Sequence, residues 1–411
     1  MSLTCSVIIP VYNQWELTRQ CLESLKAHTQ GAGYEVIVVD NGSSDATAEA
    51  LPVLGRTLFG EAFVLIRLAE NRNFGPACNL AAQQAKSPLL FLLNNDTLLW
   101  DNCLQPLIWA LDEQKDLVAV GSRLLYPDRR VQHVGIAFTQ TALTHLYRYF
   151  PCDHPVVCKD RPVQALTAAA LMLAREDFLQ LGGFCEDYRN GFEDVDLCLR
   201  LKTTGRKLKV IAASTLCHLE SQTQGRKAWD EKNAVLLKQC CGHLFSPDYH
   251  IHGLRDGFVP FLTESFELGL GMRESEEARL FLATKNKSSE QWKDAILNNP
   301  LWIHGRRFLA ELAEKQSNYA LAITLLSEVA FLRQSKSDYQ RLLQLEKWGN
   351  EENRHLFDAA HSEIARIDSV RKDLSVARAA LRAVQKSGDR FLCQLYEQGL
   401  QDLQAQLAHH C

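Results

Sequence analysis

The feature that most constrains the fold of this chain is a series of short apolar runs, rich in β-branched residues, that alternate with stretches of helical periodicity. The runs lie at Cys5–Pro10, Val36–Asp40, Phe63–Leu68 and Leu89–Leu93, and a helix is predicted from about Pro76 to Gln84 between the last two. Continuous apolar runs of this length are typical of strands that are buried on both faces of a parallel sheet. The alternation therefore predicts an α/β domain with a mixed, mostly parallel, Rossmann-like sheet.

The composition changes at about Arg255. Beyond it the strand-like runs disappear and Leu, Ala, Glu, Lys, Gln and Arg dominate, which predicts an all-α C-terminal region. A length of 411 residues favours two to three domains, and we divide the chain into 1–250, 251–350 and 351–411. The middle part resembles a tetratricopeptide-like helix pair, a weak signal in the absence of neighbouring repeats. Heptad-spaced apolar residues from Leu356 onward predict a long helix, either folded back on the domain or forming a coiled coil between copies of the chain.

Charge and cysteine placement limit the partners and the compartment. The 45 Lys+Arg and 49 Asp+Glu residues give a net charge of −4, so there is no basic excess to bind nucleic acid. The 13 cysteines are scattered through apolar stretches and the first residues lack a positively charged leader, which favours free thiols in a reducing cytoplasm. The longest apolar run, Ala165–Ala174, is too short to cross a bilayer, so a membrane role would be peripheral attachment at the inner face.

Polar residues gather where the predicted strands and helices meet. In chain order the clusters read Pro10-Val11-Tyr12-Asn13, Asp40-Asn41-Gly42-Ser43-Ser44-Asp45, Asn71-Arg72-Asn73-Phe74-Gly75 and Asn94-Asn95-Asp96-Thr97. Each by itself is typical of a helix cap or a tight turn. Because ligands of α/β sheets bind at the carboxyl ends of strands, four such clusters together indicate a binding site. Neither GxGxxG nor GxxxxGK[ST] follows the first strand, which argues against a dinucleotide-binding site and a P-loop.

Five motifs in this order carry a family resemblance: IIPVYN, VVDNGSSD, NRNFGPACN, LLNNDT and GFEDVDLCLRL. Together they resemble the family 2 glycosyltransferases with the GT-A fold over Leu3–Leu244. The stretch PDRRVQHVGI at Pro127–Ile136 is similar to the bacterial rhamnosyltransferase-like, O-antigen-type branch. The resemblance implies inverting, metal-dependent transfer of a hexosyl or deoxyhexosyl group in polysaccharide biosynthesis. The donor would be a UDP-, dTDP- or GDP-sugar, and the acceptor a saccharide, a lipid-linked glycan or a protein.

The same resemblance implies transfer of one sugar per encounter, because the QxxRW motif and the transmembrane platform of the family's processive synthases are both missing from the sequence. It also implies a site for Mn²⁺ or Mg²⁺, which would stabilise charge on the leaving phosphates. The family's Asp-x-Asp motif corresponds to Asn94-Asn95-Asp96, so Asp96 is the one carboxylate and Asn94 replaces the first aspartate. His218 matches a strand-end histidine that would be the third ligand, although outside this context it would read as a core histidine.

The remaining site residues fall into a catalytic and a nucleotide-binding group by resemblance. Asp194 matches the general base and Glu193 would position the acceptor or Asp194, although acidic residues in a first helical turn also serve the helix dipole. Asp40 would accept a hydrogen bond from the nucleobase or the ribose. Tyr12 would line the nucleobase pocket, with a plain core aromatic as the alternative. The full nucleotide-sugar set is Pro10, Tyr12, Asn13, Asp40, Asn73, Gly75 and Asn95.

Two alternative functions stay open. A nucleotidyltransferase also combines an α/β sheet with a metal, but it should carry a phosphate loop rich in glycine and lysine, which Pro10–Gln14 lacks. The other alternative is a weakly active or inactive glycosyltransferase-like scaffold that acts through its helical C-terminal region. The substitution at Asn94 is the observation that favours the scaffold.

Overall fold

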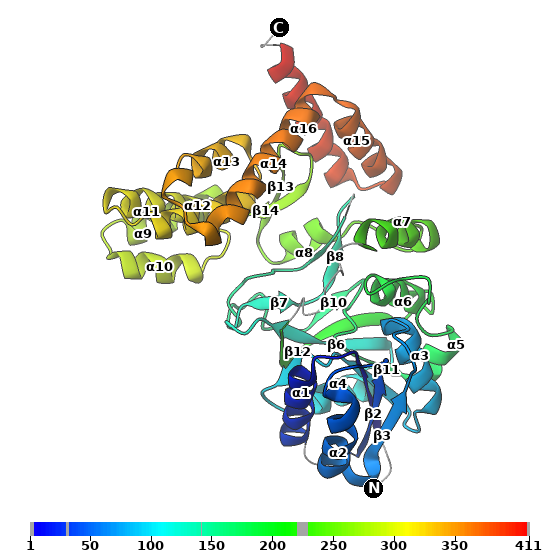
Figure 1. The fold of residues 1–411 in the computed structure, drawn as a ribbon. Helices are drawn as coiled ribbons and strands as arrows, with labels where there is room; N and C mark the ends of the chain where they lie inside the picture. Colours follow the sequence, from blue (N-terminus) through cyan, green and yellow to red (C-terminus); the bar gives the residue numbers. More distant parts are fainter. Residues whose placement is uncertain (1–3, 30–32, 141, 220–228, 409–411) are drawn as a thin grey trace. The chain divides into compact units, whose positions relative to one another are not determined.

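The computed structural model describes residues 4–29, 33–140, 142–219 and 229–408 (Figure 1). Leu3, where the family resemblance begins, and Cys411 lie outside the described residues. The chain divides into two compact units, one made of residues 1–137 and 144–245 and the other of residues 138–143 and 246–411.

The first unit is built on one mixed sheet. Its strands are β1 (Cys5–Val11), β2 (Tyr34–Asp40), β3 (Phe63–Arg67), β4 (Leu89–Leu93), β5 (Thr97–Leu99), β6 (Leu117–Leu125), β7 (Val131–His133), β10 (Arg161–Val163), β11 (Ala170–Ala174) and β12 (Lys207–His218). The order is β10-β12-β6-β11-β4-β1-β2-β3, with β5 beside β12 and β7 beside β6. β1 runs parallel to β2 and β4, β2 to β3, and β6 to β12, whereas β11 is antiparallel to β4 and β6. Strands β8 (Ile136–Phe138) and β9 (Leu143–His145) pair separately.

Helices cover both faces of this sheet. They are α1 (Trp15–His28), α2 (Thr47–Phe59), α3 (Phe74–Gln84), α4 (Leu104–Glu113), α5 (Arg175–Gln180), α6 (Glu193–Lys202) and α7 (Asp230–Cys241). Figure 1 shows α1, α2 and α4 on one side of the sheet and α3, α5 and α6 on the other. Val7 and Ile9 of β1 share a core with Leu22 of α1 and Leu51 of α2, while the alternate residue Ile8 is equally buried and points to the opposite face. The predicted α/β class is therefore confirmed.

The second unit is helical apart from one hairpin. Its elements are α8 (Tyr249–Arg255), β13 (Val259–Leu262), β14 (Leu268–Gly271), α9 (Glu274–Thr284), α10 (Ser289–Leu297), α11 (Ile303–Lys315), α12 (Tyr319–Arg333), α13 (Lys336–Leu343), α14 (Arg354–Lys372), α15 (Ser375–Ser387) and α16 (Arg390–Ala408). One apolar core joins α10 to α14 around the stacked rings of Trp292 and Trp302, and another joins the hairpin to α14, α15 and α16. The helical C-terminal region is confirmed, and the β13–β14 hairpin is an element that the sequence pattern did not predict.

The predicted single long helix after residue 351 is wrong, because the described residues 354–408 form three successive helices. α14 ends before its C-terminal cap Asp373, whose side chain accepts a hydrogen bond from the N–H of Ser375, and α15 ends before its cap Gly388, which has a φ of 72°. A glycine in the left-handed region is a common helix terminator. The heptad residues Ile367 and Ala377 are buried inside this unit. A coiled coil between copies stays a prediction, although these residues are already used for packing within the unit.

Two further properties concern compartment and membrane. Among the helices of the described residues, none combines the length and the apolar character needed to cross a membrane. The cysteines that the structure describes are free thiols.

Candidate active site

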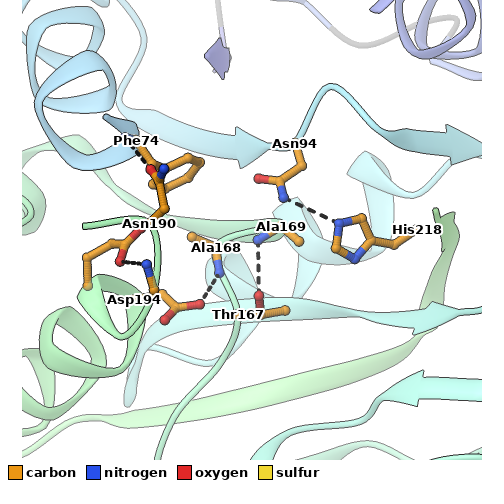
Figure 2. Close-up of a pocket in the computed structure, with 10 residues that line it drawn as sticks. Phe74, Asn94, Thr167, Ala168, Ala169, Asn190, Asp194 and His218 are labelled. Atoms are coloured by element: carbon orange, nitrogen blue, oxygen red, sulfur yellow. Dashed lines mark hydrogen bonds between the residues drawn. The ribbon is translucent and has the colours of Figure 1, made fainter. Parts of the chain in front are cut away.

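A pocket of about 140 Å³ opens where β4 and β12 end and β11 begins (Figure 2). Four of the side chains predicted from the sequence line it together: Asn94, Glu193, Asp194 and His218. The other lining residues are Phe74, Thr167, Ala168, Ala169, Asn190 and Gly191. The structure thus brings the predicted base and two of the predicted metal ligands to one cavity.

Strand pairing sets the positions of the candidate metal ligands. Thr97, the first residue of β5, pairs with His218 at the end of β12, and the N–H of Leu219 donates to the carbonyl of Asp96 at 2.9 Å. As a result, Asp96 Oδ1 lies 3.1 Å from His218 Nε2. The amide nitrogen of Asn94 lies 3.3 Å from the same imidazole atom, and Figure 2 shows these two side chains facing each other.

Gln132 of β7 fixes the orientation of the His218 ring. Its Nε2 donates to the His218 carbonyl at 3.1 Å, so its Oε1 is left to accept from Nδ1 at 2.7 Å. We therefore assign the proton of this bond to Nδ1, and Nε2 is the ring nitrogen that faces Asp96 and Asn94. This arrangement, in which an outer residue binds one ring nitrogen and leaves the other free to ligate, is typical of metal-binding histidines.

The donor set fits a divalent cation that takes further ligands from its substrate. With the proton on Nδ1, Nε2 provides a nitrogen ligand beside a carboxylate oxygen of Asp96, and rotation of the Asn94 amide would add an oxygen ligand. No group of three His, Cys, Asp or Glu side chains is arranged for metal binding in the described part of the chain. A cation held by Asp96, His218 and Asn94 would therefore depend on donor phosphates and water to complete its coordination.

The three acidic residues in the first turn of α6 have different environments. Asp194 faces the pocket, where Oδ2 accepts from the N–H of Ala168 at 3.1 Å and Oδ1 from the N–H of Val195 at 2.9 Å. Glu193 also lines the pocket, and its Oε2 accepts from the N–H of Gly191 at 2.5 Å. Asp196 is buried and forms an ion pair with Arg200 at 2.6 Å. The backbone donors stabilise the ionised form of Asp194, which is the form that can accept a proton.

The ends of β1 and β2 form a second polar cluster. The N–H of Asn13 donates to Ser43 Oγ at 2.8 Å, and Asp40 Oδ1 accepts from the N–H of Ser43 at 2.9 Å. Pro10 lies within β1, next to the start of this cluster. Tyr12 is 46% exposed, so its interpretation as a plain core aromatic is wrong. The cluster leaves an exposed ring and a buried carboxylate at the carboxyl edge of the sheet.

The other nucleotide-binding candidates have different roles in the structure. Asn73 precedes α3 with a left-handed φ of 68°. Gly75 is buried in α3, where an added Cβ would lie 3.1 Å from the Cβ of Phe184, so helix packing explains this glycine. Asn95 turns toward α1 and donates to Thr18 Oγ1 at 2.9 Å. Gly75 and Asn95 thus have structural roles of their own, and their predicted donor contacts stay predictions.

Several residues in or next to the pocket were missed by sequence reasoning. Ala168 contributes only its backbone N–H, for which no side-chain signal exists. Asn190 accepts from the N–H of Phe74 at 3.3 Å, and the Asn190-Gly191 dipeptide is a turn signal that could have marked this loop. Gln132, which orients His218 from behind the pocket lining, lies inside the PDRRVQHVGI stretch between Val131 and His133, where no local signal marks it.

Comparison with known proteins agrees with the sequence resemblance. The family model described as glycosyl transferase family 2 matches residues 6–157. The N-terminal region of this chain belongs to glycosyl transferase family 2, which confirms the predicted family. The matched segment of this family 2 domain contains Asn94, Asp96 and Gln132, whereas Asp194 and His218 come later in the chain.

Two curated relatives match the family 2 domain. The uncharacterized protein y4gI of Sinorhizobium fredii is 31% identical over 242 residues, which cover 57% of this chain and 26% of that protein. The O-antigen biosynthesis protein RfbC of Myxococcus xanthus is 30% identical over 239 residues, which cover 55% of this chain and 18% of that protein. The alignments thus span only a minor part of each relative.

Among solved structures, the mannosyltransferase PcManGT from Pyrobaculum calidifontis, in complex with GDP-Man and Mn²⁺, aligns with 90% of this chain and 87% of its own. The sequence identity is 18% and the TM-score is 0.45.

Proposed function

We propose that this chain transfers a sugar from a nucleoside-diphosphate-sugar to a hydroxyl group of an acceptor, with inversion at the anomeric carbon and one sugar per encounter. A UDP-, dTDP- or GDP-sugar is the proposed donor, and a glycan, a lipid-linked glycan or a protein is the proposed acceptor. The observation that carries the proposal is the meeting of Asp194, Asn94 and His218 in one pocket within a chain whose N-terminal region belongs to family 2.

In the proposed reaction Asp194 is the general base. Two backbone N–H groups, from Ala168 and Val195, orient its carboxylate at the pocket, where the acceptor hydroxyl would meet it. As the hydroxyl oxygen forms its bond to the anomeric carbon, its proton passes to Asp194 and the bond from that carbon to the phosphate oxygen breaks. The nucleoside diphosphate leaves with the bonding electrons. Attack and departure on opposite faces of the sugar in a single displacement give inversion.

The other residues orient the reacting groups. Glu193 binds the N–H of Gly191 and thereby fixes the start of α6, on which Asp194 is carried. Asp40 and Tyr12 are proposed to bind the nucleoside at the ends of β1 and β2. A Mn²⁺ or Mg²⁺ ion bound by Asp96, His218 and Asn94 would supply Lewis-acid stabilisation of the departing diphosphate.

Donor hydrolysis tests this proposal without knowledge of the acceptor, because water can replace the acceptor hydroxyl. A panel of UDP-, dTDP- and GDP-sugars is incubated with the parent chain and Mn²⁺ or Mg²⁺, and release of nucleoside diphosphate is measured. We expect metal-dependent turnover of at least one donor and its loss in Asp96→Ala. Asp112→Ala serves as the control, since this carboxylate is 75% exposed on α4.

The opposite outcome would favour the scaffold alternative. If no donor binds or turns over, and Asp96→Ala behaves like the parent chain, the enzymatic proposal is wrong. Asn94 in place of an aspartate would then be explained as a lost metal ligand.

A further inference from the structure

A single buried side chain on α7 binds three backbone groups of the loop that precedes α6. Asn233 Nδ2 donates to the carbonyls of Arg189 and Gly191 at 3.0 and 2.9 Å, and its Oδ1 accepts from the N–H of Arg189 at 3.4 Å. The side chain of Asn233 is buried. Because both ends of its amide are used by the same loop, Asn233 specifies the path of that loop as well as its attachment to α7.

The loop is held in a conformation that L-residues rarely adopt. Asn190, Gly191 and Phe192 follow one another with φ values of 49°, 158° and 73°. Consecutive residues with positive φ cost free energy and persist only where the surrounding structure enforces them. The bonds from Asn233, together with the bond from the Gly191 N–H to Glu193, are the contacts that enforce this path.

This loop connects two sides of the candidate active site. Asn190 accepts from the N–H of Phe74, the first residue of α3, on the side of the proposed donor motif. Phe192 is the N-terminal cap of α6, so the loop also determines where this helix, which carries Asp194, begins. Figure 2 shows Asn190 reaching Phe74 while Asp194 reaches Ala168 across the same pocket.

We propose that Asn233 is a positioning residue for the transfer reaction: it holds loop 189–192 in its left-handed path and so directs Asp194 and Asn190 into the pocket. This inference rests on the proposed function. Removal of the amide leaves the carbonyls of Arg189 and Gly191 without their donor and allows the loop to relax. The reactive arrangement is then populated in only a fraction of the molecules, and the apparent kcat is reduced to that fraction of the parent value.

The nucleotide should bind almost normally in such a variant. The cluster of Tyr12, Asn13 and Asp40 belongs to the ends of β1 and β2, and its hydrogen bonds involve Ser43 and not the loop. For Asn233→Ala we therefore expect kcat to fall roughly ten- to a hundredfold, with the Kd of the nucleoside diphosphate within about threefold of the parent value. A role limited to holding α7 in place would not separate these two quantities.

Two further variants sharpen the test. Gly191→Ala disturbs the loop independently of Asn233, because an added Cβ would lie 3.7 Å from Asn233 Nδ2 without a clash but at a φ unsuited to alanine. Leu237→Ala is the matched control: it lies one turn further along α7 and is 4% exposed, so it weakens helix packing and leaves the amide in place. We expect Leu237→Ala to lower Tm and to keep kcat within about threefold of the parent value.

The experiment measures kcat, donor KM, nucleotide Kd and Tm for the parent and for Asn233→Ala, Gly191→Ala, their double variant and Leu237→Ala. Hydrogen–deuterium exchange of peptides covering 186–196 and 74–78 is followed in parallel, because it reports loop order without any turnover. We expect faster exchange in both peptides for Asn233→Ala. We also expect the double variant to transfer sugar no more slowly than the slower of the two single variants, because both substitutions disturb the same loop and their effects should not add.

Several outcomes would overturn the inference. They are unchanged exchange in Asn233→Ala, a kcat within about threefold of the parent, fully additive losses in the double variant, or an equal kcat loss in Leu237→Ala. If the parent turns over none of the donors, the proposed function is wrong, and the exchange data alone then decide whether Asn233 orders the loop.

Discussion

Replacement of Gln132 by leucine should weaken cation binding at His218 without touching any proposed ligand. In the parent chain Gln132 accepts from His218 Nδ1 at 2.7 Å and donates to the His218 carbonyl at 3.1 Å. Leucine removes both bonds, so the imidazole proton can move to Nε2, and the ring nitrogen that faces Asp96 and Asn94 then has no lone pair to offer.

The magnitude follows from the role of outer-shell partners in metal sites. Loss of such a partner typically reduces metal affinity about 10- to 100-fold, which corresponds to roughly 1.4–2.7 kcal/mol. Gln132 is 4% exposed, so the two lost hydrogen bonds should also lower the free energy of unfolding by roughly 1–3 kcal/mol. Tm must therefore be measured beside affinity, and the titration is done well below it.

Gln132→Glu is the matched control. The carboxylate still accepts from Nδ1 and preserves the tautomer, but it loses the N–H that donates to the His218 carbonyl. Mn²⁺ is titrated into each variant in the presence of a nucleoside diphosphate, by calorimetry or by the loss of the free Mn²⁺ resonance, above the ordinary histidine pKa of about 6.5. We expect the glutamate variant to bind Mn²⁺ within about tenfold of the parent and the leucine variant to bind it more weakly than the glutamate variant. A folded leucine variant with parental affinity would refute the assignment of His218 as a ligand oriented by Gln132.

Three further predictions concern stability and assembly. Asp196→Asn should lower the free energy of unfolding by about 1–3 kcal/mol in urea denaturation, because it breaks the ion pair between buried Asp196 and partly exposed Arg200. Mn²⁺ and nucleotide affinity should stay parental, and a change in affinity with little change in stability would contradict this. Burial, followed by the nearby His145 and His218, holds the pKa of His133 well below its usual value. The unfolded chain therefore takes up this proton at higher pH than the folded chain, so stability should fall below pH of about 6.5 by up to about 1.4 kcal/mol per pH unit. His133→Phe should flatten the Tm profile in that window, and equal slopes would contradict the assignment. Finally, light scattering should give the mass of one chain, 46.4 kDa, because heptad residues such as Ile367 are buried within the second unit. A stable mass of two chains would show self-association.

The sequence predicted those parts of the fold in which local pattern and burial agree. The runs Val36–Asp40 and Leu89–Leu93 are buried on both faces of the sheet, and their uninterrupted apolar character is a direct consequence. The apolar pattern did not predict β12, because Lys207, Lys209 and Ser214 interrupt it and the pairing with β6 is irregular between Ile211 and Thr215; only the strand end at His218 was expected, from the family resemblance. The hairpin β13–β14 was missed because Pro260 and two glycines weaken any strand signal.

The family resemblance predicted Asp194, Asp96 and His218 as members of one site, and the pairing of β5 with β12 accounts for the contact between the last two. The positioning of these groups could not be predicted in the same way. The N–H of Ala168 acts through the backbone, and Asn233 acts from a helix 39 residues beyond Asp194, so neither leaves a local pattern near the motif. Gly75 shows a second limit of motif reasoning, because packing against Phe184 gives this glycine a structural role that the motif alone did not indicate, while its proposed donor contact stays a prediction.

The most direct test of the central claim is the rate of sugar transfer by Asp194→Asn. Asparagine keeps the size of the side chain and can still accept from the N–H of Ala168, but it cannot take the proton of the acceptor hydroxyl. With a donor identified from the hydrolysis panel, we expect unchanged donor binding and transfer slower by about 10²–10⁴-fold. Transfer at close to the parental rate by a folded Asp194→Asn variant would contradict the assignment of Asp194 as the base.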